Sequence, residues 1–156
     1  MISIQRPGME NLDIEFILID FDGTLAMDGR VHPKAKDKIN LLSKRTKIYI
    51  MTKSEGEKVG EALRKTKAEI LYFKEGEAPQ AKMKLLQQME PQQTVVIGNG
   101  LDDVPIMERA GLAICVIGKE GSSSEAMAKA DLIVTNVLDA LDFLLKPLRQ
   151  RATLSR

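Results

Sequence analysis

An almost unbroken apolar segment that ends in two aspartates constrains this chain more than any other part of its sequence. Residues 14–19 are nearly all apolar, which is typical of a strand buried on both faces in a parallel sheet. Asp20 and Asp22 follow, and side chains two apart in an extended segment point to the same side. Two close carboxylates need a cation or a proton between them. Because open α/β sheets bind ligands where their strands end, we expect a functional site here.

Strand-like and helix-like segments alternate along the rest of the chain. The expected strands are residues 12–20, 47–51, 69–73, 94–97, 112–117 and 132–134. The expected helices are residues 33–44, 55–65, 78–89, 102–109, 125–130 and 137–145. This order predicts an α/β fold with a mostly parallel central sheet and helices on both faces.

Three shorter segments complete the expected architecture. Residues 2–5 should form a strand that turns at Pro7-Gly8 and pairs back on the 12–20 strand, giving an N-terminal β-hairpin. Residues 23–33 should be a loop with a tight turn at Asp28-Gly29. The arginines after Pro147 (Arg149, Arg151 and Arg156) should belong to a solvated tail.

Composition narrows the classes of function. A chain of 156 residues suits one domain spanning residues 1–156. The net charge of +1 and the aromatic content of 4% argue against a nucleic-acid partner. No apolar run is long enough for membrane insertion, and residues 1–8 lack the layout of a signal peptide. With one cysteine, no internal disulfide can form, and we expect a cytoplasmic protein.

The string Asp20-Phe21-Asp22-Gly23-Thr24-Leu25 after an apolar strand resembles motif I of the haloacid dehalogenase (HAD) superfamily of phosphohydrolases. The resemblance implies a Rossmann-like HAD fold in which Asp20 attacks phosphorus and forms an aspartyl-phosphate. It implies that Asp22 is the general acid and base. Thr24 would orient the loop at the phosphate site. The alternative is an exposed, aspartate-rich turn after a core strand.

Two further motifs of this superfamily have candidates here. Thr52 follows the 47–51 strand and resembles motif II, whose hydroxyl binds a phosphate oxygen. The alternative for Thr52 is a helix cap, although Ser54 is the expected cap of the next helix. Motif III is a lysine, and helical spacing places Lys82 on the apolar side and Lys84 on the opposite side. We therefore assign Lys82 to the phosphate site; the alternative is a lysine that extends from the stripe edge to solvent.

Residues 98–107, Gly-Asn-Gly-Leu-Asp-Asp-Val-Pro-Ile-Met, resemble motif IV, most closely the metal loop of P-type ATPase phosphorylation domains. Asn99 stands where an aspartate is usual, and Asp102 stands where those ATPases carry asparagine. The resemblance implies a Mg²⁺ site, since hard oxygen ligands suit this ion. The candidate metal ligands are Asp20, the Phe21 carbonyl, Asp22, Asn99, Asp102 and Asp103. Which loop residue binds directly stays open, and so does the alternative of a capped helix start with exposed acids.

The resemblance covers almost the whole chain and extends to soluble P-type-ATPase-like proteins. Residues 24–52 and 52–82 leave no room for a cap domain, so the site should be open. We expect a Mg²⁺-dependent phosphatase acting on an unknown small-molecule or protein-borne phosphate ester, with a homo-oligomer as one way to close the site. The alternative is a regulatory module that binds phosphate and metal with little turnover and acts with a transporter.

Overall fold

A computed structural model describes residues 1–54 and 56–156, and its centre is a six-stranded sheet in which every neighbouring pair is parallel. The strands are β3 (Phe16–Asp20), β6 (Lys47–Thr52), β7 (Glu69–Tyr72), β8 (Thr94–Gly98), β9 (Leu112–Val116) and β10 (Leu132–Val134). Their spatial order is β10-β9-β8-β3-β6-β7. The chain order therefore reverses between β3 and β8, which is where open α/β sheets bind ligands.

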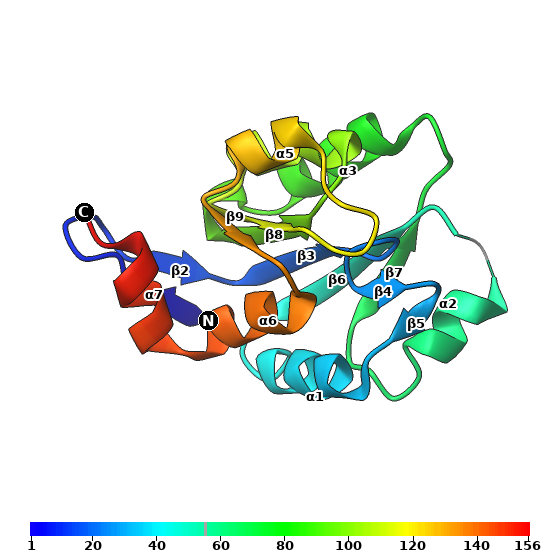
Figure 1. Cartoon of the computed structure of the whole chain (residues 1–156), viewed down its shortest axis with the longest axis horizontal. Helices are drawn as coiled ribbons and strands as arrows, with labels where there is room; N and C mark the ends of the chain where they lie inside the picture. The colour runs from blue at the N-terminus through cyan, green and yellow to red at the C-terminus, as the bar shows by residue number, and fades with distance from the viewer. Residues whose placement is uncertain (55) are drawn as a thin grey trace.

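Helices cover both faces of this sheet, which confirms the predicted fold class (Figure 1). The helices are α1 (Pro33–Leu42), α2 (Glu57–Ala62), α3 (Ala78–Gln88), α4 (Val104–Arg109), α5 (Ser124–Lys129), α6 (Val137–Leu145) and α7 (Pro147–Leu154). Two short 3₁₀ turns, η1 (Pro91–Gln93) and η2 (Leu101–Asp103), precede β8 and α4. Helices α1 and α6 pack together on one face, while α3, α4 and α5 cover the other. Within the described residues, no helix is both long and apolar enough to cross a bilayer.

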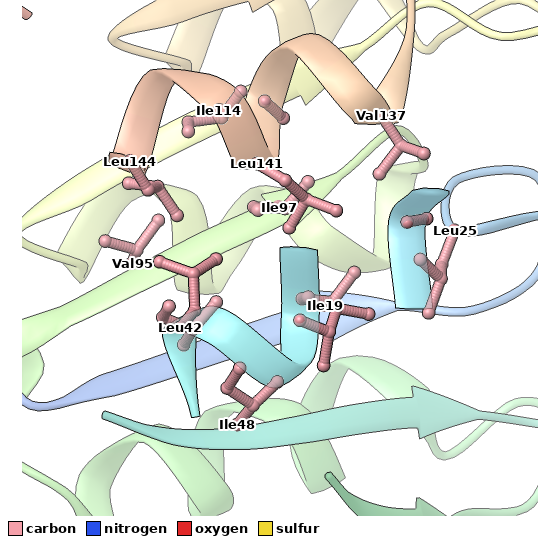
Figure 2. Close-up of a cluster of buried hydrophobic side chains, with 14 of the residues drawn as sticks. Ile19, Leu25, Leu42, Ile48, Val95, Ile97, Ile114, Val137, Leu141 and Leu144 are labelled. Atoms are coloured by element: carbon pink, nitrogen blue, oxygen red, sulfur yellow. The ribbon is translucent and has the colours of Figure 1, made fainter. Parts of the chain in front are cut away.

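The alternation of side chains along the strands divides the core into two hydrophobic clusters. In β3, Ile17 and Ile19 belong to the larger cluster beneath α1 and α6, and Leu18 belongs to the smaller one beneath α3 to α5. Figure 2 shows part of the larger cluster, with Ile19 of β3 and Leu141 of α6 among its side chains. A strand buried on both faces fits the near-continuous apolar run from which it was predicted.

The register of β3 aligns the strand ends that carry the candidate site residues. Asp20 is paired with Met51 of β6, and Ile19 is paired with Ile97 of β8. Thr52, the last residue of β6, and Asn99, which follows β8, therefore lie at the same edge of the sheet as Asp20.

The N-terminal hairpin is also confirmed, with one difference. Strands β1 (Ile2–Ile4) and β2 (Leu12–Ile14) pair in antiparallel fashion as a separate two-stranded sheet. The expected 12–20 strand is interrupted at Glu15, whose N–H donates to the Gln93 carbonyl and whose carbonyl accepts from the Lys47 N–H. These bonds lie outside the β1–β2 pairing, so the run splits into β2 and β3.

Two segments without predicted helices or strands are ordered elements. The loop expected over residues 23–33 is therefore wrong, apart from its tight turn at Asp28-Gly29, which is confirmed. Residues 23–33 contain strands β4 (Ala26–Met27) and β5 (Arg30–Val31), joined at Asp28 (φ 54°) and Gly29 (φ 77°). Positive φ at both central residues is the two-residue hairpin turn that Asp-Gly favours. The segment after Lys146 is helix α7, which begins at Pro147 and buries Gln150, while the three arginines are exposed, as predicted. The Gln150 side-chain amide donates to the Phe143 carbonyl, which fixes α7 against α6.

The centre of the larger cluster should tolerate truncation poorly. Leu141 of α6 is fully buried, so Leu141→Ala should lower the free energy of unfolding by about 2–5 kcal/mol through lost burial and a residual cavity. Leu148→Ala is the matched control, because Leu148 is 81% exposed, and its effect should stay within about 0.5 kcal/mol. Denaturant unfolding measures both values, and equal losses would contradict the described packing.

Asp142 should make stability depend on pH. Its carboxylate lies 2.6 Å from Lys38 Nζ of α1, and this hydrogen bond holds the pKa of Asp142 below its usual range. A lowered folded-state pKa contributes stability above the unfolded-state pKa of about 3.9, and this contribution disappears as pH falls through the folded-state value. Asp142→Asn should therefore cost about 1 kcal/mol at pH 7 and almost nothing at the lowest pH. Unfolding curves across this pH range provide the measurement; a pH-independent difference would contradict the assignment.

Candidate active site

The ends of β3, β6 and β8 bring the predicted acids, hydroxyl and ammonium to one edge of the sheet. A cavity of about 480 Å³ lies there, and Asp20, Asp22, Asn99 and Asp102 are among its lining residues. Asp20 is 7% exposed, so the alternative of an exposed aspartate-rich turn is wrong for this residue. The acids of the metal loop are not simply exposed at a helix start either, because Asp103 is fully buried.

Lys82 connects the three acidic side chains of the site. Its Nζ lies 2.6 Å from Asp103 Oδ1, 3.1 Å from Asp102 Oδ2 and 3.5 Å from Asp20 Oδ1. Lys82 is fully buried on α3, whereas Lys84 is exposed, as the helical spacing predicts. The Phe73 ring, whose centroid is 5.3 Å from Nζ, adds a favourable cation–π contact. A buried, charged lysine is stable here because carboxylate oxygens take the place of the water molecules that would otherwise solvate its ammonium group.

The electrostatics of the cluster are dominated by an excess of negative charge. Burial raises the pKa of Asp20 well above its usual value, the charge of Asp103 raises it further, and Lys82 acts in the opposite direction. Burial by itself would lower the pKa of Lys82, but the charges of Asp103, Asp20 and Asp102 outweigh burial and raise it. Lys82 therefore stays charged, and Asp20 is the group that needs a further cation or a proton.

Asp103 fixes the loop after β8. Its Oδ2 accepts hydrogen bonds from the N–H groups of Asn99 and Gly100 at 3.1 and 3.2 Å, while its Oδ1 accepts from Lys82. A Cβ at position 98 would clash with the carboxylate of Asp103, so this approach requires Gly98. Both oxygens of Asp103 are thus bonded within the protein, which makes its role partly structural.

Asp22 also lines the cavity and contacts the end of β6 and the residues that follow it. Its carboxylate accepts from Thr52 Oγ1 at 3.1 Å and from Ser54 Oγ at 2.9 Å. The sequence predicts a helix over residues 55–65 with Ser54 as its cap. The capping prediction is wrong, because α2 begins at Glu57 and Gly56 is its cap residue. Residue 55 lies outside the described residues. The hydroxyl of Ser54 is instead part of the site.

Asp22, a predicted metal ligand, lines the cavity but does not belong to the cluster of Asp20, Asp102 and Asp103. Two further predicted site residues, Phe21 and Thr24, do not line the cavity at all. The Phe21 carbonyl accepts from the N–H groups of Thr24 and Ala26 at 3.3 and 2.9 Å, so its oxygen is used by the turn and Phe21 is removed from the proposed metal ligands. Thr24 is fully buried and lines a different cavity, so it does not contact phosphate through the site around Asp20. The turn conformation after Asp22 explains both differences.

Several residues that the motifs did not single out also line the cavity. Lys53 Nζ lies 3.6 Å from Asp102 Oδ2, and Glu120, Ser122 and Ser123 come from the loop after β9. Lys53 directly follows Thr52, and the β9 loop follows a fourth strand that ends at the same edge of the sheet. Their position next to these strand ends is the sequence feature from which both could have been predicted to line the site.

The acids can hold a cation. Asp20, Asp102 and Asp103 each place one carboxylate oxygen within 4.8 Å of the others. Three carboxylates against the single buried charge of Lys82 leave a net negative site, and carboxylate oxygens suit Mg²⁺. The donor set therefore fits the predicted ion. Asn99 lines the same cavity and donates from its side-chain amide to the Gly23 carbonyl at 3.3 Å.

Removing the ammonium of Lys82 should destabilise the folded protein, because the buried acids would then repel one another. Lys82→Met keeps the apolar stem but leaves the buried Asp103 without a cation, so it should lower the free energy of unfolding at pH 7 by about 3–5 kcal/mol. Lys84→Met, two residues along the same helix and exposed, should change it by about 0.5 kcal/mol or less. Denaturant unfolding measures both changes. A similarly small loss of unfolding free energy in the two variants would show that Lys82 is not the main counter-charge of the acids.

Solved structures with high overall similarity are phosphatases and hydrolases. One is the 3-deoxy-D-manno-octulosonate 8-phosphate phosphatase of Moraxella catarrhalis in complex with magnesium, phosphate and its KDO molecule; it is 18% identical, covers 90% of this chain and 89% of that chain, and has a TM-score of 0.71. A Legionella pneumophila protein described as a HAD superfamily hydrolase is 17% identical, covers 90% and 87%, and has a TM-score of 0.72. At these identities the likeness shows the fold, and the predicted HAD fold is confirmed.

A sequence relative gives a narrower likeness. No protein-family model matches the sequence. The uncharacterized protein MJ0073 of Methanocaldococcus jannaschii is 39% identical over 77 residues, which are 47% of this chain and 83% of that protein. The expected grouping with P-type-ATPase-like proteins stays a prediction. The chain belongs to the family of MJ0073 and has the fold of the HAD superfamily.

Proposed function

We propose that this chain is a Mg²⁺-dependent phosphohydrolase that cleaves a phosphate monoester through an aspartyl-phosphate on Asp20. The observation that carries the proposal is the contact of one fully buried ammonium, that of Lys82, with three aspartates beside a polar cavity. Burying charges is costly, so a cluster of this kind is typical of a functional site. The fold shared with phosphatases supports the same reaction class.

Asp20 is the nucleophile in this proposal. Its carboxylate lines the cavity, and one oxygen attacks phosphorus while the bond from phosphorus to the leaving oxygen breaks. The attack requires the ionised carboxylate, which burial and Asp103 disfavour and Lys82 favours. The position of Lys82, 3.5 Å from Asp20, therefore supports the nucleophile as well as the incoming phosphate.

Asp22 is the proton carrier. As a carboxylic acid it gives its proton to the leaving oxygen, and as a carboxylate it then takes a proton from the water that attacks phosphorus. That second attack breaks the bond from phosphorus to Asp20 and releases inorganic phosphate. Thr52 and Ser54 hold the carboxylate of Asp22 by two hydrogen bonds, which fixes its orientation at the cavity.

Lys82, Lys53 and Thr52 would neutralise and orient the phosphoryl oxygens. Lys53 is 40% exposed at its side chain and lines the cavity, so it can reach an anionic substrate from the solvent side. Thr52 Oγ1 now donates to Asp22, so binding a phosphoryl oxygen requires its hydroxyl to rotate. Positioning and charge neutralisation supply most of the catalysis of phosphoryl transfer.

Mg²⁺ would be held by Asp20, Asp102 and the side chain of Asn99, all of which line the cavity. Asp103 completes the acidic cluster, although its oxygens already accept bonds from Lys82 and two backbone N–H groups. The chemistry that a bound Mg²⁺ supplies is neutralisation of charge between an anionic nucleophile and an anionic phosphoryl group.

Residues 1–156 form the proposed single domain.

Replacing the nucleophile provides the direct test. Asp20→Asn should lower phosphate release from p-nitrophenyl phosphate and from a panel of sugar phosphates by roughly 10³-fold or more, because the amide cannot form the intermediate. Asp28→Asn is the control, since Asp28 lies in the β4–β5 turn and not at the cavity, and its rate should match wild type. Chelation of Mg²⁺ should abolish release by the wild-type protein, and added Mg²⁺ should restore it.

Two outcomes would count against this function. Release that survives chelation or Asp20→Asn would show that another group does the chemistry. No release from any ester, with binding of inorganic phosphate intact, would favour the second candidate, a phosphate- and metal-binding module with little turnover. The amide of Asn99, bonded to the Gly23 carbonyl where an acid would carry charge, is the observation that favours this candidate.

A further inference from the structure

A second cavity, of about 650 Å³, lies on the other side of the turn that follows Asp22. Its walls come from the β4–β5 hairpin, the start of α1, the residues after β9 and β10, and the start of α6. It shares no lining residue with the cavity that contains Asp20, among the residues that the structure describes. A volume of this size is typical of sites for small organic molecules.

The charge of this cavity is one-sided. Arg30 and Lys119 line it, together with His32, whereas no described aspartate or glutamate does. Neither cation forms an ion pair with a described residue, although the whole chain carries 23 basic and 22 acidic residues. The first residues of α1 and α6 also lie in the wall, and a helix start carries partial positive charge. The cavity is therefore suited to an anion.

Much of the remaining wall is apolar. Leu25 and Val137, which lie at the same end of the hydrophobic cluster in Figure 2, belong to this wall, and Met27 and Ile117 extend it. Thr24 is fully buried in the same wall, and its hydroxyl has no hydrogen-bond partner among the described residues. The Thr24 oxygen has no accessible surface, so it lies behind the wall, and the cavity offers a ligand its cations and its apolar side chains.

We propose that this cavity is a second ligand site, and that it binds a small organic anion with an apolar body. The anionic group would lie between Arg30 and Lys119, and the body would pack on Leu25, Met27 and Val137. Lys119 lines this cavity and its neighbour Glu120 lines the cavity of Asp20, so an occupant would contact the same loop that borders the catalytic site.

The test uses two fluorescent probes that differ by one charge. 8-Anilino-1-naphthalenesulfonate carries a sulfonate, and N-phenyl-1-naphthylamine is the same aromatic body without it. Titration of the folded wild-type protein should give saturable binding of the sulfonate, at least about 10-fold tighter than the neutral probe. Lys119→Ala and Arg30→Ala should each weaken the sulfonate about 5-fold and leave the neutral probe unchanged.

A matched variant and a wall variant complete the test. Lys58→Ala removes an exposed cation from the neighbouring groove beside α2 and should not change either affinity. Leu138→Asp places a carboxylate in the cavity wall, in a first helical turn where an acid is favoured, and should weaken the sulfonate most. Equal affinity for the two probes, or equal losses in Lys58→Ala and Lys119→Ala, would overturn the proposal.

The activity assay then separates two sources of the ligand. Competition between the sulfonate and a phosphate ester would identify the occupant as the leaving-group part of the substrate. A changed kcat at saturating ester would identify a separate effector. Both results support a ligand site, while the binding titration alone can reject it, independently of whether the proposed phosphatase activity exists.

Discussion

The contact of the Lys82 ammonium with three carboxylates is the interaction on which the site depends. Asp20 comes from β3 and Asp102 and Asp103 from the turn after β8, so one side chain on α3 connects three separate parts of the fold. Burial makes each of these charges costly if it stands alone. Mutual neutralisation removes much of that cost and leaves an excess of negative charge facing the cavity. The same imbalance that makes the cluster difficult to bury makes it suited to a bound cation.

Much of the fold could be predicted because the local signals agree with the tertiary structure. The apolar run of β3 is buried on both faces, and the apolar stripe of α1 is the face that packs inward. The same spacing distinguished Lys82 from Lys84, since only one of them lies on the buried side of α3. The proximity of Asp20, Thr52 and the β8 loop could be predicted because parallel strands end at one edge of the sheet.

The sequence was less informative where contacts between distant residues determine the local structure. Helix α7 is rich in arginine and looks solvated, but Gln150 docks on the end of α6 and Arg149 lies 3.8 Å from Asp142. The β4–β5 pairing involves two residues a side, too few for a periodic signal. Ser54 lost its expected capping role because Asp22, distant in sequence, offers its hydroxyl a stronger acceptor. No local pattern records such a competition between partners.

The space that Gly98 leaves for Asp103 has a consequence for how this family can diverge. Any side chain at position 98 would displace the carboxylate, and with it the backbone bonds that shape the metal loop. Position 98 therefore cannot take a side chain while Asp103 keeps its present place. Glu120, at the solvent side of the same cavity, also lies where a Cβ at Gly23 would be, but its side chain is exposed and can move away. New substrate preferences would therefore arise at the exposed rim, whereas position 98 stays a glycine for as long as Asp103 shapes the metal loop.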